Sequence, residues 1–139
     1  MTTHPVTPDI AQKILNDYFA SWVRALDLSV VSIDADHALL RMPLGDHLAR
    51  VGGIVSGQAL AALADTGMVF AAIGHSGSAR PYATTDLHTQ FLRPGVGTAI
   101  LCRANVVRAG KALVFTRADM TQEDDGKIVA TATATFYAA

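Results

Sequence analysis

The pattern of apolar and polar positions marks two helical segments in this chain. Residues 8–24 carry apolar side chains at helical spacing, and Thr7 followed by Pro8 is typical of a helix start. Residues 55–73 are Ala-rich and apolar on nearly all sides, and glycines follow within residues 74–77. The pattern predicts an amphipathic N-terminal helix and a long, buried central helix.

The other apolar segments are short, and turn-forming residues separate them. Six segments are predicted as strands: residues 26–33, 37–42, 82–92, 98–108, 113–122 and 127–137. Asp34-Ala35-Asp36 joins the first two, and Pro94-Gly95, Ala109-Gly110-Lys111 and Asp124-Asp125-Gly126 separate the last four. We therefore expect a hairpin before the central helix, a glycine-bearing loop at residues 45–53, and a four-stranded meander after the helix.

A central helix that is apolar all round must be covered on most sides, and a curved antiparallel sheet of about six strands is available to cover it. This arrangement is the α+β hot-dog fold, here with an extra N-terminal helix, and residues 1–139 form a single domain. Such a sheet leaves strand edges and part of the helix uncovered. We expect these surfaces to pair with a second copy of the chain.

Composition excludes several classes of partner. Charged residues make up 17% of the chain and the formal net charge is −1, so no global field attracts nucleic acid or an anionic membrane. Ser56, Gln58 and Asp65 interrupt the apolar segment 55–73, which favours a core helix over a membrane span. Cys102 is the only cysteine and the N-terminus lacks the order of a signal peptide, so we expect a cytoplasmic protein.

The most informative single residue is Asp65, which lies in the middle of the longest apolar segment. An ionised carboxylate there is costly unless something compensates it, and no basic residue lies within a helical turn or two in sequence. Either a partner arrives from elsewhere in the fold, or the carboxylate faces a cleft and is used chemically. The second interpretation is our working hypothesis.

Several motifs occur in the order and spacing of a known family. They are Gly53-Ile54-Val55-Ser56-Gly57-Gln58 with Asp65-Thr66, Tyr82-Ala83-Thr84-Thr85-Asp86-Leu87, Phe91-Leu92-Arg93-Pro94-Gly95, Val107-Arg108-Ala109-Gly110-Lys111, and Asp125-Gly126-Lys127-Ile128-Val129-Ala130. Together they resemble the acyl-CoA thioesterases of the phenylacetate-pathway (PaaI) type within the hot-dog superfamily. The resemblance covers residues 39–136. It implies hydrolysis of acyl-CoA or aryl-CoA thioesters by a homodimer or homotetramer, with no cofactor besides the coenzyme A of the substrate.

The resemblance also implies the roles of three residues. The backbone amide of Gly57 corresponds to the oxyanion donor, Asp65 to the base or nucleophile, and Thr84 to the residue that orients water. Physical chemistry agrees with the first role, because N–H groups in the first turn of a helix lack partners and favour negative charge. Thr85 takes the place of Thr84 if the strand register slips by one. In the family, the site spans two subunits.

Three positions depart from the family pattern. Ser56 replaces the usual His, Gln58 replaces the second Gly, and Arg50 stands where many members carry Asn. A non-catalytic module that binds or senses acyl-CoA is therefore the main alternative. Gln58 precedes Asp65 by seven residues and shares its helix face, so it is either a substrate contact or a partly exposed polar residue.

Coenzyme A carries phosphates that need cations or backbone amides. Arg93, Arg108 and Lys111 lie at predicted strand ends or turns and are candidates, although ordinary solvated charges also occupy such places. Five large apolar residues line an acyl pocket or belong to the core: Tyr18, Phe19, Trp22, Met68 and Phe70.

Other chemistries are less favoured. No metal is expected, because no paired ligand spacing occurs among the five histidines, His4, His37, His47, His75 and His88. Ser56 and Ser76 lack the flanking glycines of a nucleophile elbow. A hot-dog dehydratase needs a His placed with the acid. The nearest candidate, His47, lies eighteen residues before Asp65, without the Pro-rich connection that dehydratases carry.

Overall fold

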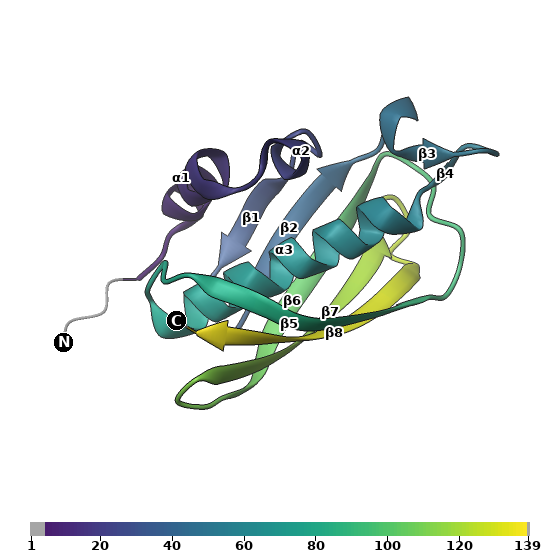
Figure 1. The fold of residues 1–139 in the computed structure, drawn as a ribbon. Helices are drawn as coiled ribbons and strands as arrows, with labels where there is room; N and C mark the ends of the chain where they lie inside the picture. Colours follow the sequence, from purple (N-terminus) through teal and green to yellow (C-terminus); the bar gives the residue numbers. More distant parts are fainter. Residues whose placement is uncertain (1–4, 139) are drawn as a thin grey trace.

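The computed structural model describes residues 5–138 and has the predicted hot-dog fold (Figure 1). A six-stranded antiparallel sheet curves around the long helix α3, Gly57–Ser76. The strands of this sheet are β1 Ser29–Ile33, β2 Ala38–Pro43, β5 Tyr82–Phe91, β6 Ala99–Ala109, β7 Leu113–Gln122 and β8 Ile128–Ala138. In the predicted loop before α3, the structure adds the 3-10 helix Asp46–Leu48 and a two-stranded sheet of β3 Ala49–Arg50 and β4 Ile54–Val55.

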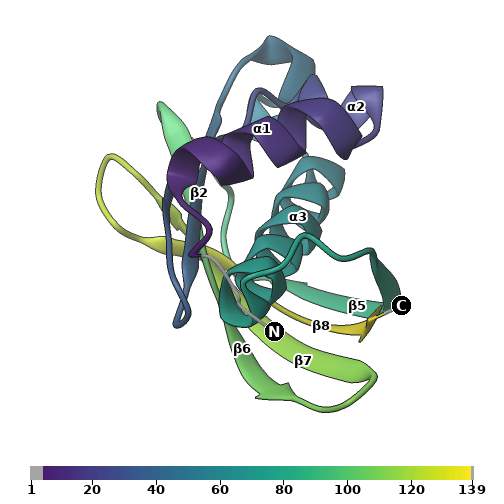
Figure 2. The same ribbon diagram turned by 90° about the vertical axis from the view of Figure 1, so that its left-hand side faces the viewer.

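The strand order is β1-β2-β6-β7-β8-β5, so one predicted connection is wrong. The β6–β7 and β7–β8 hairpins form as expected, but β5 pairs with β8 and not with β6. Pro94 and Gly95 belong to a crossover that passes the start of α3, where the amide of Val55 donates to the carbonyl of Gly95 at 3.1 Å. As a result, β5 becomes an edge strand that lies beside α3 (Figures 1 and 2).

A β-bulge in β5 controls which side chains face α3. The register with β8 shifts between Thr84 and Asp86, so Thr85 is an extra residue. Because side chains alternate along a strand, one extra residue reverses their facing beyond it. Tyr82 and Thr84 contact α3 before the bulge, and the ring of Phe91 lies against the first turn of α3 after it. The bulge thus lets both ends of β5 present side chains to one helix.

The ends of α3 are set by local chemistry. The hydroxyl oxygen of Ser56 caps the helix by accepting from the amide of Ala59 at 3.2 Å. Gly77 ends it in the left-handed conformation with φ of 71°, which glycine adopts without strain. The helix therefore runs over residues 57–76, shifted slightly from the predicted 55–73.

Most of α3 is buried inside the protein, although its length and composition alone would suffice for a membrane span. One face remains partly open because the sheet does not reach around it. We call this face the open stripe; it consists of Gly57, Ala61, Asp65 and Val69. Its four residues recur at every fourth position, so they lie along one side of the helix.

The predicted N-terminal helix over residues 8–24 is in fact two helices, α1 Pro8–Tyr18 and α2 Ser21–Arg24. Phe19 and Ala20 between them are extended, with ψ of 154° and 147°. The ring of Phe19 stacks on Phe70 of α3, with centroids 5.4 Å apart and an interplanar angle of 15°. No Gly or Pro stands at the break, and the stacking on Phe70 holds the ring of Phe19 in the core.

We predict that Gly74→Ala destabilises the fold, because Gly74 is where α3 passes closest to the β1–β2 turn. A Cβ atom there would lie 2.5 Å from the carbonyl oxygen of Asp34 and 2.9 Å from Cγ1 of Ile33. A backbone carbonyl cannot move aside cheaply, so we expect a loss of about 1–3 kcal/mol in the free energy of unfolding. Urea denaturation measures this value. An increase, as helix propensity alone would give, would contradict the assigned close approach.

Candidate active site

Asp65 lies midway along the open stripe, and Thr84 of β5 is its partner. The hydroxyl of Thr84 donates a hydrogen bond of 2.9 Å to Oδ1 of Asp65. Burial raises the pKa of Asp65, and the hydrogen bond from Thr84 offsets part of that rise. Neither cause is a neighbouring cation, so within residues 5–138 no positive charge offsets the burial of the carboxylate. Such a group is typical of functional sites.

Thr84→Val is predicted to raise the pKa of Asp65 further, because it removes the hydrogen bond that stabilises the ionised form. The pH titration of the carboxyl carbon, followed by NMR, measures the change directly. Thr85→Val is the matched control, because the hydroxyl of Thr85 donates to the carbonyl of Thr135 at 3.1 Å and not to Asp65. Equal shifts in the two variants would rule out a specific role for Thr84.

A large cavity of about 790 Å³ opens beside Asp65. We call it the carboxylate cavity. It is lined by Ile14, Tyr18, Phe19, Ala20, Trp22, Val23, Asp65, Val69, Ile73, Ala79, Arg80, Pro81, Tyr82 and Thr84. Of the five residues predicted for an acyl pocket or the core, Tyr18, Phe19 and Trp22 line this cavity. The other two, Met68 and Phe70, are fully buried core residues.

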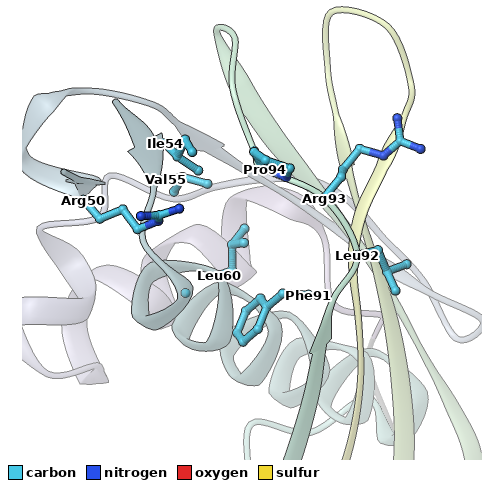
Figure 3. A pocket seen from close by; sticks show the side chains of 10 residues that line it. Arg50, Ile54, Val55, Leu60, Phe91, Leu92, Arg93 and Pro94 are labelled. Carbon is cyan, nitrogen blue, oxygen red and sulfur yellow. The ribbon is translucent and has the colours of Figure 1, made fainter. Parts of the chain in front are cut away.

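A second cavity of about 380 Å³ lies at the first turn of α3 (Figure 3). We call it the helix-start cavity. Its lining comprises Arg50, Ile54, Val55, Gly57, Leu60, Phe91, Leu92, Arg93, Pro94 and Gly95. Figure 3 shows Arg50 extending beneath Val55, whereas the guanidinium of Arg93 points away from the helix. The cavity thus combines a helix N-terminus with the side chain of Arg50, a setting that favours an anion or an oxyanion.

The remaining predicted residues have other positions. Ser56 is the N-cap of α3, and the exposed Gln58 lines neither of these two cavities. Arg108, near the end of β6, and Lys111, in the β6–β7 turn, also lie outside both. No group of three or more His, Cys, Asp or Glu side chains suited to a metal ion occurs within residues 5–138. His4 lies outside the described residues.

Phe91 is a site residue that sequence reasoning missed. It belongs to a strand that was predicted correctly, but only the bulge at Thr85 reveals that its ring faces α3. A Cβ atom at Gly57 would lie 3.2 Å from that ring. Phe91 therefore covers part of the first turn, and a larger residue at position 57 would have to displace it.

Gly57 and Asp65 are too far apart on one chain to act on the same carbonyl group. Eight residues of helix separate them, and at 1.5 Å per residue this is about 12 Å along the axis. A reacting carbonyl needs the oxyanion donor and the base each within about 3 Å. If these two groups act on one carbonyl group, Gly57 must therefore come from one chain and Asp65 from another.

Comparison with known proteins points to one family. Residues 52–129 match the sequence model described as the thioesterase superfamily. A protein of Thermoplasma acidophilum, provisionally named an esterase, is 28% identical over 120 residues, which cover 84% of this chain and 86% of that one.

Solved structures share the fold. A conserved protein of Pseudomonas aeruginosa has a TM-score of 0.80 at 28% identity, with coverage of 87% of this chain and 95% of that chain. A thioesterase of Haemophilus influenzae has a TM-score of 0.87 at 18% identity, covering 99% and 93%. The PaaI protein from the phenylacetic acid degradation operon of E. coli has a TM-score of 0.81 at 20% identity, covering 93% and 90%.

Proposed function

Because the chain belongs to the thioesterase superfamily and is a thioester hydrolase, we propose that it converts acyl-CoA or aryl-CoA thioesters to the free acid and coenzyme A. The observation that carries this proposal is the Asp65–Thr84 pair, an uncompensated carboxylate with a hydrogen-bonded orienting group. It stands at the wall of an apolar cavity large enough for an acyl group.

The active unit in this proposal is a homodimer with two equal sites. Ala61 lies midway between Gly57 and Asp65 on the open stripe. If two α3 helices pack antiparallel with Ala61 against Ala61, Gly57 of each helix comes opposite Asp65 of the other. The exposed edge strand β5 runs beside the stripe and supports the same pairing. Two dimers then assemble into a homotetramer.

The chemistry assigns one task to each group. The Gly57 amide donates to the thioester oxygen as it gains negative charge. Asp65 of the other subunit either deprotonates the attacking water or attacks the carbonyl carbon itself, and Thr84 fixes the carboxylate for both routes. In the second route the acyl group is left on Asp65 as a mixed anhydride, which water then hydrolyses to the free acid and the carboxylate. The C–S bond breaks and coenzyme A leaves as its thiolate, which takes up a proton.

The coenzyme A portion is assigned to the helix-start cavity. Arg50 and Arg93 are the cations of that cavity and suit the phosphates of the coenzyme. Arg108 and Lys111 lie at the opposite end of β6 from this cavity, so in this proposal they contact the nucleotide end only from another subunit. No cofactor or metal is assigned to the reaction, and the expected location is the cytoplasm.

The test is release of free thiol from a panel of acyl- and aryl-CoAs by the purified protein, together with sedimentation analysis. We expect turnover by a dimer or larger assembly. Arg50, Ser56 and Gln58, where the family has other residues, favour a binding or sensing module as the second candidate. Tight binding of acyl-CoA with no thiol release would establish that alternative and refute hydrolysis. A fully active monomer would refute the shared site.

A further inference from the structure

The N-terminal helices build one wall of the carboxylate cavity. Ile14 and Tyr18 come from α1, and Trp22 and Val23 come from α2. This wall precedes residues 52–129, the part of the chain that matches the family model. Its shape depends on the break at Phe19, because that break turns α2 out of the line of α1.

The rim of the cavity carries aromatic side chains that water largely surrounds. Tyr18 is 80% exposed and Trp22 is 61% exposed, although the neighbouring Val23 and Leu15 are buried. A single exposed aromatic is ordinary, but two at the mouth of one apolar cavity form a surface suited to a ligand. Asp65 and Thr84 mark the reactive end of the same cavity.

We propose that the carboxylate cavity is the acyl-binding site, and that its α1–α2 wall selects thioesters with a bulky apolar acyl group. This inference rests on the proposed hydrolysis. At about 790 Å³ the cavity is within the size range of drug-sized ligand sites, and an acetyl group would leave most of it unfilled. Its lining is mainly apolar, so filling it with an aromatic ring or a medium-length chain removes apolar surface from water.

The expected preference follows from the buried area. Each buried methylene strengthens binding by about fourfold, so hexanoyl-CoA, which has four more methylenes, should bind up to about 250-fold more tightly than acetyl-CoA. Calorimetry on the Asp65→Asn variant measures these affinities without turnover. Benzoyl-CoA tests an aromatic acyl group. Stacking of its ring on Trp22 or Tyr18 would raise the affinity by about two- to tenfold beyond the effect of burying its apolar area.

Trp22 provides a readout that does not depend on hydrolysis, because it is the only tryptophan of the chain. Bulky acyl-CoAs should change its fluorescence at concentrations where acetyl-CoA and free coenzyme A do not. If the fluorescence changes while no thiol is released, the acyl-binding site is supported and only the proposed hydrolysis is refuted. Unchanged fluorescence with saturating hexanoyl-CoA and benzoyl-CoA would refute the site.

Trp22→Ala should lower the ratio of hexanoyl-CoA to acetyl-CoA affinity by about tenfold. Tyr137→Ala is the matched control, because Tyr137 is a 49% exposed aromatic on β8 that lines neither cavity, and its ratio should equal that of the parent. Equal affinities of the parent protein for hexanoyl-CoA and acetyl-CoA would overturn the inference even if thiol is released. So would a Trp22→Ala variant that dissociates the dimer with its ratio unchanged, because the rim would then be a subunit contact.

Discussion

Asp65→Asn should abolish most of the hydrolysis while leaving the protein folded and dimeric. The substitution keeps the size of the side chain and its contact with Thr84, but the amide can neither accept a proton from water nor attack a thioester. A positioned acid–base group is worth about two to four orders of magnitude in rate. Steady-state thiol release, with the dimer verified by sedimentation, measures the loss. Turnover near the parental value would remove Asp65 from the mechanism.

Stability provides an independent check on the same variant. Burial raises the pKa of Asp65, so the folded protein binds that proton more tightly than the unfolded chain does. Stability therefore falls as the pH rises from the ordinary pKa of the carboxyl through its raised value, and the ionised group opposes folding at neutral pH. Asparagine carries no such charge. We expect the variant to unfold at a urea concentration equal to or higher than that of the parent at pH 7, and lower resistance would contradict this account.

Gly57→Pro should lower turnover by about two to three orders of magnitude, the usual effect of losing an oxyanion donor. Proline removes the amide proton, and the backbone accepts it: position 57 is the first of α3, where proline is favoured, and Ser56 already has φ of −68° and ψ of 147°. Gly57→Ala is the matched control, because it adds the same Cβ atom beside Phe91 but keeps the amide. The alanine variant should retain at least about tenfold more activity than the proline variant.

Ser56→Ala completes this comparison. The hydroxyl oxygen of Ser56 caps α3, so its loss should cost about 1 kcal/mol of stability and less than tenfold in turnover. Thermal unfolding and thiol release measure the two effects. If Ser56→Ala were folded and inactive while Gly57→Pro remained active, the hydroxyl and not the amide would be the oxyanion donor or nucleophile.

Local patterns in the sequence were sufficient for most of the fold. The Ala-rich segment is apolar on nearly every side, which only a wrapped helix satisfies, and strand alternation with turn residues located all six long strands. The isolated Asp65 identified the candidate site for the same reason, because a charge within an apolar helix needs an explanation. The family resemblance identified Thr84 as a residue that orients water, and the structure shows in addition that its hydroxyl is hydrogen-bonded to Asp65.

The errors concern features that depend on distant parts of the chain. Pro94-Gly95 has the composition of a hairpin turn, yet β5 pairs with β8 because the edge beside α3 is where its side chains contact the helix. The helix break lies at Phe19, whose ring stacks on Phe70, fifty-one residues away. Neither the β5–β8 pairing nor the Phe19–Phe70 stacking can be predicted from the residues next to it in sequence. For the same reason the rim formed by Trp22 could not be separated from ordinary core packing before the structure was known.

The pairing of β5 with β8 also affects how a newly made chain folds. During synthesis β5 leaves the ribosome more than thirty residues ahead of β8, its only neighbour in the sheet. Until β8 follows, the edge of β5 and the apolar surface of α3 are open to aggregation, and such long-range strand pairing is slow. The bulge that directs Thr84 toward Asp65 exists only when β5 is paired, so the reactive site is among the last parts of the chain to assemble.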